Sequence, residues 1–287
     1  MPDLDSHAKN RVSWNAATRQ HNSHKGDQAA FLRDGGTTLF PEEIELLGDI
    51  RGKTLVHLQC NSGQDTLSIA NHLGADVTGV DISDEAVTFA QQLSADSEIP
   101  GQFVRADVFD WFAQNSTQYD ILFSSYGAIG WLSDLVSWGA GVAAALKPGG
   151  RFVLVEFHPA LGMVDYDDPT RIIYDYGGGK REEFDDGVGD YVAMSGSGLT
   201  QDGSDASTRQ AWINSNPSVE FMWGIGDVTM ALTNAGLRLT RVQEYMYSNG
   251  YRPLKNMREE PGRRMYMPDD LPRLPLMFSI VAEKPDV

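Results

Sequence analysis

The chain has 287 residues, of which 41% are hydrophobic, and a formal net charge of −17 from 23 Lys and Arg against 40 Asp and Glu. This length suits one large domain or one domain with an insertion, and the apolar fraction is sufficient for a buried core. A nucleic-acid partner is disfavoured, because contact with phosphates needs a basic face and the chain has no dense Lys/Arg cluster.

Cysteine content and hydropathy limit the expected location. Cys60 is the only cysteine of the sequence, which excludes an intramolecular disulfide. The first residues, MPDLDSHAKNRVSWN, lack the apolar segment of a secretory signal, and no run approaches about 18 apolar residues. We therefore expect a soluble cytoplasmic protein with no membrane partner.

Residues 1–45 are polar with scattered aromatic residues, and we interpret them as a helical, lid-like segment. A helix is expected near Asp5–Gln20, followed by a loop that holds His21 and His24. A short helix should begin at Pro41–Glu43, because proline suits the first helical turn and acids complement the N-terminal dipole.

Strands and helices alternate from residue 54 onward. The expected strands are Thr54–Leu58, Asp76–Val80, Gly101–Arg105, Asp120–Ser124 and Arg151–Phe157. Helical patterns lie between them, at about Gln64–Leu73, from Ser83 onward, and at about Leu132–Leu146. This alternation predicts an α/β fold with a doubly wound, mostly parallel sheet.

Residues 160–220 interrupt the alternation, and we interpret them as a β-rich cap insertion. Arg171–Phe184 has the pattern of a hairpin around Gly177–Gly179, and residues 187–207 have that of strand and loop. Residues 46–159 and 221–287 are expected to form the main domain. Its last part should contain a helix and two strands, at Gly226–Ala235, Leu237–Tyr247 and Leu276–Glu283.

The most informative stretch runs from Thr54 to Asp81. An apolar run enters a turn of small and polar residues, a helical pattern follows, and a second apolar run ends on Asp81. Such a unit places backbone N–H groups and a carboxylate around a nucleoside at the carboxyl ends of parallel strands. The turn lacks the G-x-G-x-x-G that binds a pyrophosphate, which argues against an NAD-dependent dehydrogenase.

Further signals follow the later strands: Asp107 after the third, Asp120 in the fourth, and Leu-Lys-Pro-Gly-Gly-Arg-Phe entering the fifth. Over about residues 50–160, this order resembles the class I (Rossmann-like) S-adenosylmethionine-dependent methyltransferases, and most closely the bacterial-type small-molecule enzymes. The resemblance implies a seven-stranded sheet with an antiparallel last strand. It also implies S-adenosyl-L-methionine as methyl donor and S-adenosyl-L-homocysteine as product.

The resemblance further implies a set of donor-binding residues. Gly63 would permit a close backbone approach to the nucleoside, and Asp81 would accept hydrogen bonds from the ribose diol. Asp107 is implied to face the adenine amino group, with Ile82 and Val108 on either side of the adenine ring.

The turn after the first strand departs from the family pattern. The family commonly has an acid at the position of His57, and that acid often helps to hold the amine of the donor. We therefore expect Gln59, Asn61 or Asp65 to replace it. Ser124, at the end of the fourth strand, is included among the donor contacts because the methyl-transfer face of the family lies there.

Methyl transfer from a sulfonium is a direct displacement that needs positioning, desolvation and sometimes a base. The candidate catalytic residues are His158, Tyr126 and His24, although His158 could equally cap the fifth strand. Aromatic residues after the later strands form either a lid over a flat acceptor or ordinary core: Trp131, Trp138, Tyr191, Trp212, Phe221 and Trp223.

The expected function is methyl transfer to O, N or C of a small-molecule acceptor. The alternative is a protein of this fold that binds the donor without transferring methyl and assists a cyclisation or has a regulatory role. No metal is expected. The identity of the acceptor and the oligomeric state stay open at this stage.

Overall fold

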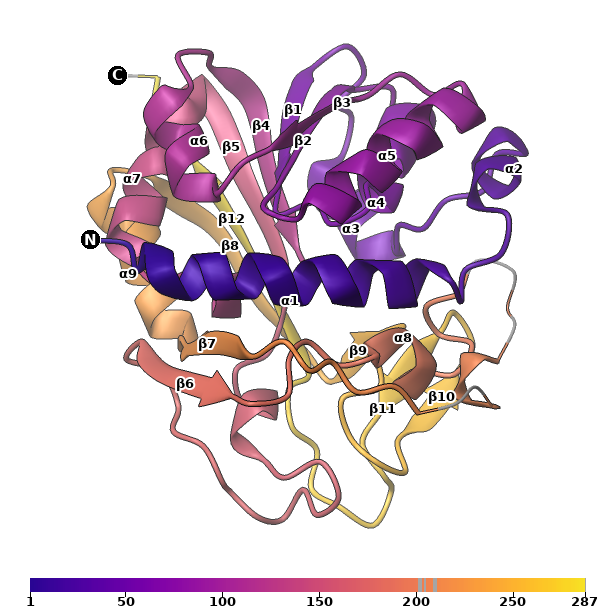
Figure 1. The fold of residues 1–287 in the computed structure, drawn as a ribbon. Coiled ribbons are helices and arrows are strands. Elements are labelled where there is room, and N and C mark those ends of the chain that lie inside the picture. Colours follow the sequence, from indigo (N-terminus) through magenta and orange to yellow (C-terminus); the bar gives the residue numbers. More distant parts are fainter. Residues whose placement is uncertain (201–202, 204, 209–210, 287) are drawn as a thin grey trace.

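A seven-stranded sheet forms the centre of the molecule in the computed structural model, which describes residues 1–200, 203, 205–208 and 211–286 (Figure 1). The strand order is β3-β2-β1-β4-β5-β12-β8. The bounds are β1 (Thr54–Leu58), β2 (Asp76–Asp81), β3 (Gln102–Arg105), β4 (Tyr119–Ser125), β5 (Leu146–Phe157), β8 (Arg238–Tyr245) and β12 (Met277–Glu283). The first five strands pair in parallel, and β12 is antiparallel to both β5 and β8. The predicted fold class is confirmed.

Helices cover both faces of this sheet. Their bounds are α1 (Leu4–Asn22), α2 (Gln28–Arg33), α3 (Pro41–Leu47), α4 (Gln64–Ser68), α5 (Asp84–Ser97), α6 (Val108–Gln114), α7 (Leu135–Ala145), α8 (Tyr191–Met194) and α9 (Ile225–Asn234). Alternate strand residues enter two separate cores, because successive side chains of a strand point to opposite faces. In β5, Phe152 and Leu154 pack with α6, α7 and α9, whereas Val153 and Val155 pack toward α3.

Local sequence signals explain several element ends. Ser83 caps α5, since its Oγ accepts the N–H of Ala86 at 3.1 Å. Pro41 is the first residue of α3, and Gly236 follows α9 with φ +86°. The predicted helix at 64–73 is α-helical only to Ser68, after which Ile69–Leu73 forms a π-helical turn. Helix α6 was not among the predicted elements.

The cap consists of two small sheets and differs from the prediction. Strand β6 (Lys180–Phe184) pairs with β7 (Ser218–Met222), so the hairpin predicted around Gly177–Gly179 is wrong. The segment expected to be strand and loop contains helix α8 instead. The second sheet comprises β9 (Tyr247–Asn249), β10 (Arg258–Glu260) and β11 (Arg264–Tyr266), which come from the part of the chain assigned to the main domain. Residues 201, 202 and 204 of the predicted polar loop lie outside the described residues.

Helix α1 crosses the molecule between the central sheet and the cap (Figure 1). Asn10 binds the backbone of β7 twice: its Nδ2 donates to the Val219 carbonyl at 2.8 Å, and its Oδ1 accepts the Val219 N–H at 2.7 Å. On the sheet side, the guanidinium of Arg11 donates to the Asp84 carboxylate at 2.7 Å. The first helix therefore connects the two layers that enclose the site.

Of the helices in the described residues, none has the length and apolar character needed to cross a membrane.

Candidate functional site

A cavity of about 1250 Å³ lies at the carboxyl edge of the parallel strands. Residues that follow β1 to β5 line one side, and residues of α1, β7 and the cap loops line the other. Most of the predicted donor-binding residues border this cavity: Gln59, Asn61, Asp65, Asp81, Ile82, Asp107 and Val108. Gly63, Ser124 and His24 are not among its lining residues.

Asp81 ends β2 and fixes the two loops around it. Its Oδ2 accepts the N–H of Asn61 and its Oδ1 accepts the N–H of Ser83, both at 2.8 Å. Burial raises the pKa of Asp81 to about 6, although these backbone N–H groups favour the charged form. A carboxylate oxygen can accept more than one hydrogen bond, so Asp81 retains capacity toward the cavity.

The turn after β1 is built from left-handed residues. Gln59 has φ +55°, Asn61 has φ +49° and Gly63 has φ +77°. Gln59 Nε2 donates to the Ala128 carbonyl at 2.7 Å, while its buried Oε1 has no hydrogen-bond partner within the described part of the chain. This oxygen is therefore an acceptor at the cavity wall that a ligand can satisfy.

Packing against the core explains why residue 63 is a glycine. A Cβ built on this residue would lie 2.7 Å from both Ala90 Cβ and Phe103 Cε1. Together with the positive φ, this close packing against α5 and β3 requires a glycine. The missing side chain makes room for Ala90 and Phe103, and Gly63 itself is not among the residues that line the cavity.

Asp107 lies beside Ile82 and Val108 at the adenine end that the resemblance implies. It caps α6, since its Oδ1 accepts the N–H of Phe109 at 2.8 Å. Its Oδ2 lies 2.7 Å from Nδ1 of His7, whose ring stacks on Phe109. No local sequence pattern indicates this contact with the N-terminal helix.

His57 occupies the position where related turns carry an acid. Its Nδ1 lies 2.9 Å from Thr66 Oγ1 and its Nε2 lies 3.2 Å from Ser125 Oγ. Burial lowers the pKa of His57 to about 4, so the ring is neutral at pH 7. It joins β1, α4 and β4 as a buried hydrogen-bonding bridge.

Charged side chains of both signs meet at one end of the cavity. Thr38 Oγ1 donates to Asp65 Oδ1 at 2.5 Å. Burial lowers the pKa of Lys25 to about 8, and the charge of Asp65 acts in the opposite direction. Burial also lowers the pKa of Arg263, and the charge of Asp65 acts in the opposite direction. Two cations and a carboxylate, with the free oxygen of Gln59 at the same cavity, complement an α-amino acid group. Lys25 and Arg263 are isolated in loops, so sequence patterns did not identify them.

His158 borders the cavity, but its geometry does not suit the predicted role of base. Its Nδ1 accepts the N–H of Ala160 at 3.1 Å, and its Nε2 donates to Glu244 Oε1 at 2.9 Å. Burial lowers the pKa of His158, against the effect of Glu244. With both ring nitrogens engaged, His158 holds the end of β5, as the structural alternative proposed.

The other two catalytic candidates are also engaged by the protein. His24 Nε2 lies 2.8 Å from Asp190 Oδ2 and ties the end of α1 to α8. The hydroxyl of Tyr126 accepts a hydrogen bond from Asn249 Nδ2 at 3.0 Å and forms a second hydrogen bond with the carboxyl group of Glu43. Burial raises the pKa of Tyr126 well above its usual range, so the hydroxyl stays protonated and does not act as a base.

Ser124 is completely buried within β4. Its neighbour Ser125 borders the cavity instead, because the two side chains point to opposite faces of the strand. At the end of β4, Ser125 and not Ser124 is therefore the serine that a ligand in the cavity can reach.

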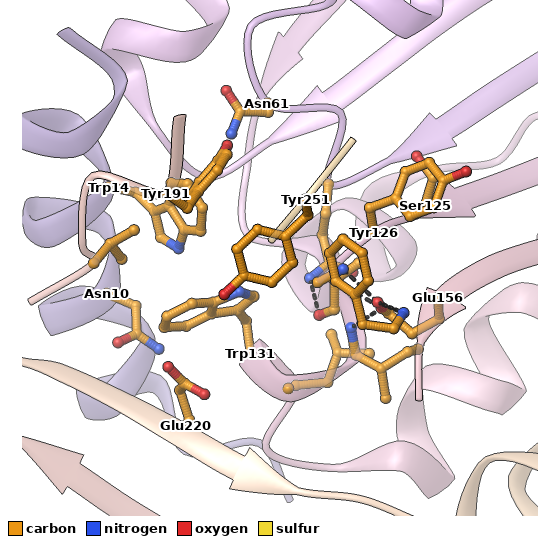
Figure 2. Close-up of a pocket in the computed structure, with 18 of the residues that line it drawn as sticks. Asn10, Trp14, Asn61, Ser125, Tyr126, Trp131, Glu156, Tyr191, Glu220 and Tyr251 are labelled. Carbon is orange, nitrogen blue, oxygen red and sulfur yellow. Dashed lines mark hydrogen bonds between the residues drawn. The ribbon is translucent and has the colours of Figure 1, made fainter. Parts of the chain in front are cut away.

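The loop after β4 is held by a buried carboxylate. Glu156 accepts the N–H groups of Ala128 at 2.8 Å, Ile129 at 3.0 Å and Phe157 at 2.6 Å, and also that of Gly127 (Figure 2). Burial raises the pKa of Glu156 while these donors lower it. This one side chain fixes the backbone of residues 127–129, which line the cavity.

Aromatic side chains form the remaining wall. Ring centroids lie 5.3 Å apart for Trp131 and Trp14, 6.4 Å for Trp14 and Tyr191, and 6.2 Å for Tyr191 and Tyr251. Phe157 continues the series at 4.8 Å from Tyr251. Figure 2 shows the rings of Trp14, Trp131, Tyr191 and Tyr251 around the same space as Glu220, an acid of β7 that belongs to no sequence motif. In the sequence, the only indication of Glu220 is that it is a single acid within the largely apolar segment Ser218–Met222.

Comparisons with known proteins identify a domain type and a fold. Residues 56–150 match a family model described as a methyltransferase domain. No curated protein matches the chain by sequence.

Solved structures resemble the fold at low sequence identity. A putative S-adenosylmethionine-dependent methyltransferase from Listeria monocytogenes has 18% identity and a TM-score of 0.56, covering 85% of this chain and 95% of that one. The glycopeptide N-methyltransferase MtfA, complexed with sinefungin, has 15% identity and a TM-score of 0.53, covering 85% of each chain. The [4+2]-cyclase SpnF has 13% identity and a TM-score of 0.50, covering 84% of this chain and 78% of that one. The chain therefore contains a methyltransferase domain and has the fold of the class I S-adenosylmethionine-dependent methyltransferases.

Proposed function

We propose that this methyltransferase uses S-adenosyl-L-methionine to methylate a small-molecule acceptor bound inside the cavity. The observation that carries the proposal is the size of the cavity, together with the two kinds of residue that line it: polar residues at the strand ends, and aromatic residues with Glu220. Pockets for one drug-sized ligand measure about 300–1,000 Å³, and about 1250 Å³ accommodates a donor and a modest acceptor together.

The residues at the strand ends match the parts of the donor. Asp81 would accept hydrogen bonds from the ribose, while Ile82 and Val108 would flank the adenine beside Asp107. Gln59 Oε1 and Asp65 would hold the amine of the methionine part. Lys25 and Arg263 would hold its carboxylate, because both cations border the same end of the cavity as Asp65.

The donor supplies an electrophilic methyl group on a sulfonium. The acceptor forms the new bond to the methyl carbon while the carbon–sulfur bond breaks and its electron pair stays on sulfur. The protein positions the two reactants and excludes water, through the backbone held by Glu156 and the aromatic wall. The candidate bases His158, Tyr126 and His24 are all engaged by other groups, so positioning is the main contribution that the structure supports.

Calorimetric titration with S-adenosylmethionine and S-adenosylhomocysteine tests the donor site. We expect both to bind, and Asp81→Ala to weaken binding about 10- to 100-fold through loss of charge-assisted hydrogen bonds. Asp76→Ala, at the exposed start of the same strand, is the matched control and should bind as the native protein does. Failure of the folded native protein to bind either compound would overturn the proposal.

A second candidate function is donor binding without methyl transfer. It is motivated by the engaged side chains of all three candidate bases, and the similar SpnF structure is a cyclase. Incubation with methyl-labelled donor and a panel of amines, phenols and carboxylates separates the two functions. Label transferred to any of these small molecules supports the methyltransferase, and donor binding with no transfer to any of them supports the alternative.

A further inference from the structure

The part of the cavity away from the donor residues has the character of a cation site. We propose that the acceptor is a small molecule with a protonated amino group, and that Glu220 is the anionic anchor for this group between the aromatic walls. This inference rests on the proposed function, because it assigns the acceptor of the same site.

Glu220 is the one acid of β7 and borders the cavity. Its strand is fixed on both sides, since Asn10 holds the adjacent residue Val219 and β6 pairs along the other edge. Burial raises the pKa of Glu220 to about 7, and no hydrogen bond or charge of the described residues offsets this effect. A partly buried carboxylate with a fixed backbone and no compensating protein group is costly unless a ligand provides the partner.

The surrounding groups select a cation over an anion. Figure 2 shows the Glu220 carboxylate rising from β7 toward Trp131, with the hydroxyl of Tyr251 directed into the same space. Trp131 packs edge-on against Trp14, and both rings border the cavity. Aromatic faces carry negative potential and attract ammonium groups, so rings and carboxylate act together. A phenolate or carboxylate acceptor would be repelled by both.

The charged and titratable neighbours of Glu220 do not supply the missing positive charge. Glu182 lies directly opposite in the β6–β7 pairing, but it is bonded to Lys180 at 2.8 Å. Burial raises the pKa of Tyr251 to about 12, and the charge of Glu220 adds to this effect, so its hydroxyl stays a neutral donor. Lys25 and Arg263 face Asp65 and not Glu220. Among the described lining residues, both ends of the cavity contain carboxylates, but Lys and Arg side chains lie only at the donor end.

The position of these two cations also gives the acceptor a direction. An ammonium group is drawn to Glu220 and repelled by Lys25 and Arg263, so the rest of the acceptor is directed along the rings of Tyr191, Tyr251 and Phe157. Binding of the cation should strengthen as the pH rises through about 7, because Glu220 then becomes charged.

The test uses phenethylamine as a cationic probe, phenethyl alcohol as its neutral analogue and 3-phenylpropionate as an anionic one. Each is titrated into the full-length protein at pH 8, with and without saturating S-adenosylhomocysteine, and binding is followed by tryptophan fluorescence and calorimetry. We expect phenethylamine to bind the native protein at least about tenfold more tightly than the other two. Glu220→Gln should remove this preference, while Glu182→Gln, the acid on the opposite strand, should keep it.

Three results would overturn the inference: no binding of phenethylamine, equal or tighter binding of the alcohol or the anion, or an unchanged amine affinity in Glu220→Gln. The titration with S-adenosylhomocysteine reports on the donor site independently. A native protein that binds this compound but shows no amine preference contradicts the acceptor assignment alone. A protein that shows the amine preference but never binds the donor product contradicts the proposed function instead.

Discussion

Nδ1 of His7 lies 2.7 Å from Oδ2 of Asp107, and this contact joins the N-terminal helix to the first turn of α6. Both side chains are largely buried and both border the cavity. Helix α1 therefore contacts the proposed adenine end through His7 and the acceptor end through Asn10 and Trp14. Its docking affects both halves of the site.

Replacement of His7 by alanine should loosen α1. The variant loses a buried hydrogen bond to a carboxylate and the stacking on Phe109, which together contribute about 1–3 kcal/mol. Native-state hydrogen exchange should show faster exchange of the amides in Leu4–Asn22. Lys9→Ala, which removes a solvent-exposed ion pair with Glu183 on the same helix, is the control and should change exchange little. Equal exchange in the two variants would contradict the role of His7.

Gly63→Ala should lower the free energy of unfolding by about 2–4 kcal/mol. A positive φ costs about 1 kcal/mol for alanine, and overlap of the new Cβ with Ala90 and Phe103 adds the rest. Gly52→Ala isolates the first contribution, because Gly52 has φ +71° with nothing within 4 Å of its Cβ position. Urea unfolding of both variants gives the comparison. A Gly63 variant no less stable than the Gly52 variant would show that the packing argument is wrong.

The buried ring of His57 should make the protein sensitive to acid. Its pKa is about 4 in the folded protein against 6.5 ordinarily, so the unfolded chain binds more protons between these values. The contribution of the neutral His57 ring to the free energy of unfolding is complete above about pH 6.5. As the pH falls toward 4, this contribution is lost, by up to about 3 kcal/mol. His57→Gln should remove this part of the pH dependence.

The measurement is urea unfolding of the native protein and of His57→Gln at several pH values between 4 and 7. His21 has a similarly lowered pKa, while Asp81 and Glu220 have raised pKa values and act in the opposite direction. These groups are present in both proteins, so the difference between the two curves isolates His57. Parallel curves would refute the prediction.

Glu156→Ala should destabilise the protein by about 3–5 kcal/mol. The change leaves the N–H groups of Ala128, Ile129 and Phe157 without their acceptor in a buried loop. Glu244→Ala removes a half-exposed partner of His158 and should cost about 1 kcal/mol or less. Chemical denaturation measures both. A loss below about 1 kcal/mol for Glu156→Ala would mean that the loop after β4 is held by other contacts.

The sequence patterns predicted the central sheet because its signals are local. Each of the first five strands is a short apolar run followed by a turn or a helix start, and Asp81 closes a unit of fewer than thirty residues. The position of Asp81 at the cavity follows from parallel strand topology alone. The same topology placed Asp107 and Tyr126 at this edge.

The cap and the acceptor side depend on contacts between distant segments. Strand β6 pairs with β7 across more than thirty residues, and local turn residues at Gly177–Gly179 suggested a nearer partner. Likewise, His24 and His158 have the chemistry of catalytic bases, and only their partners Asp190 and Glu244 show that they are engaged. The hydrophobic periodicity of the sequence does not reveal such pairings between distant residues. Glu220 was overlooked because an acid on a half-exposed strand is common.

The paired hydrogen bonds between Asn10 and Val219 have a consequence for how the protein folds. The two residues are 209 positions apart, so closing this contact carries a large loop entropy and is expected to occur late. The parallel strands β1 to β5 require only shorter closures and can form earlier. Recovery of amine binding during refolding would therefore lag behind recovery of β-sheet signal, which makes the ligand a kinetic reporter of the last docking step.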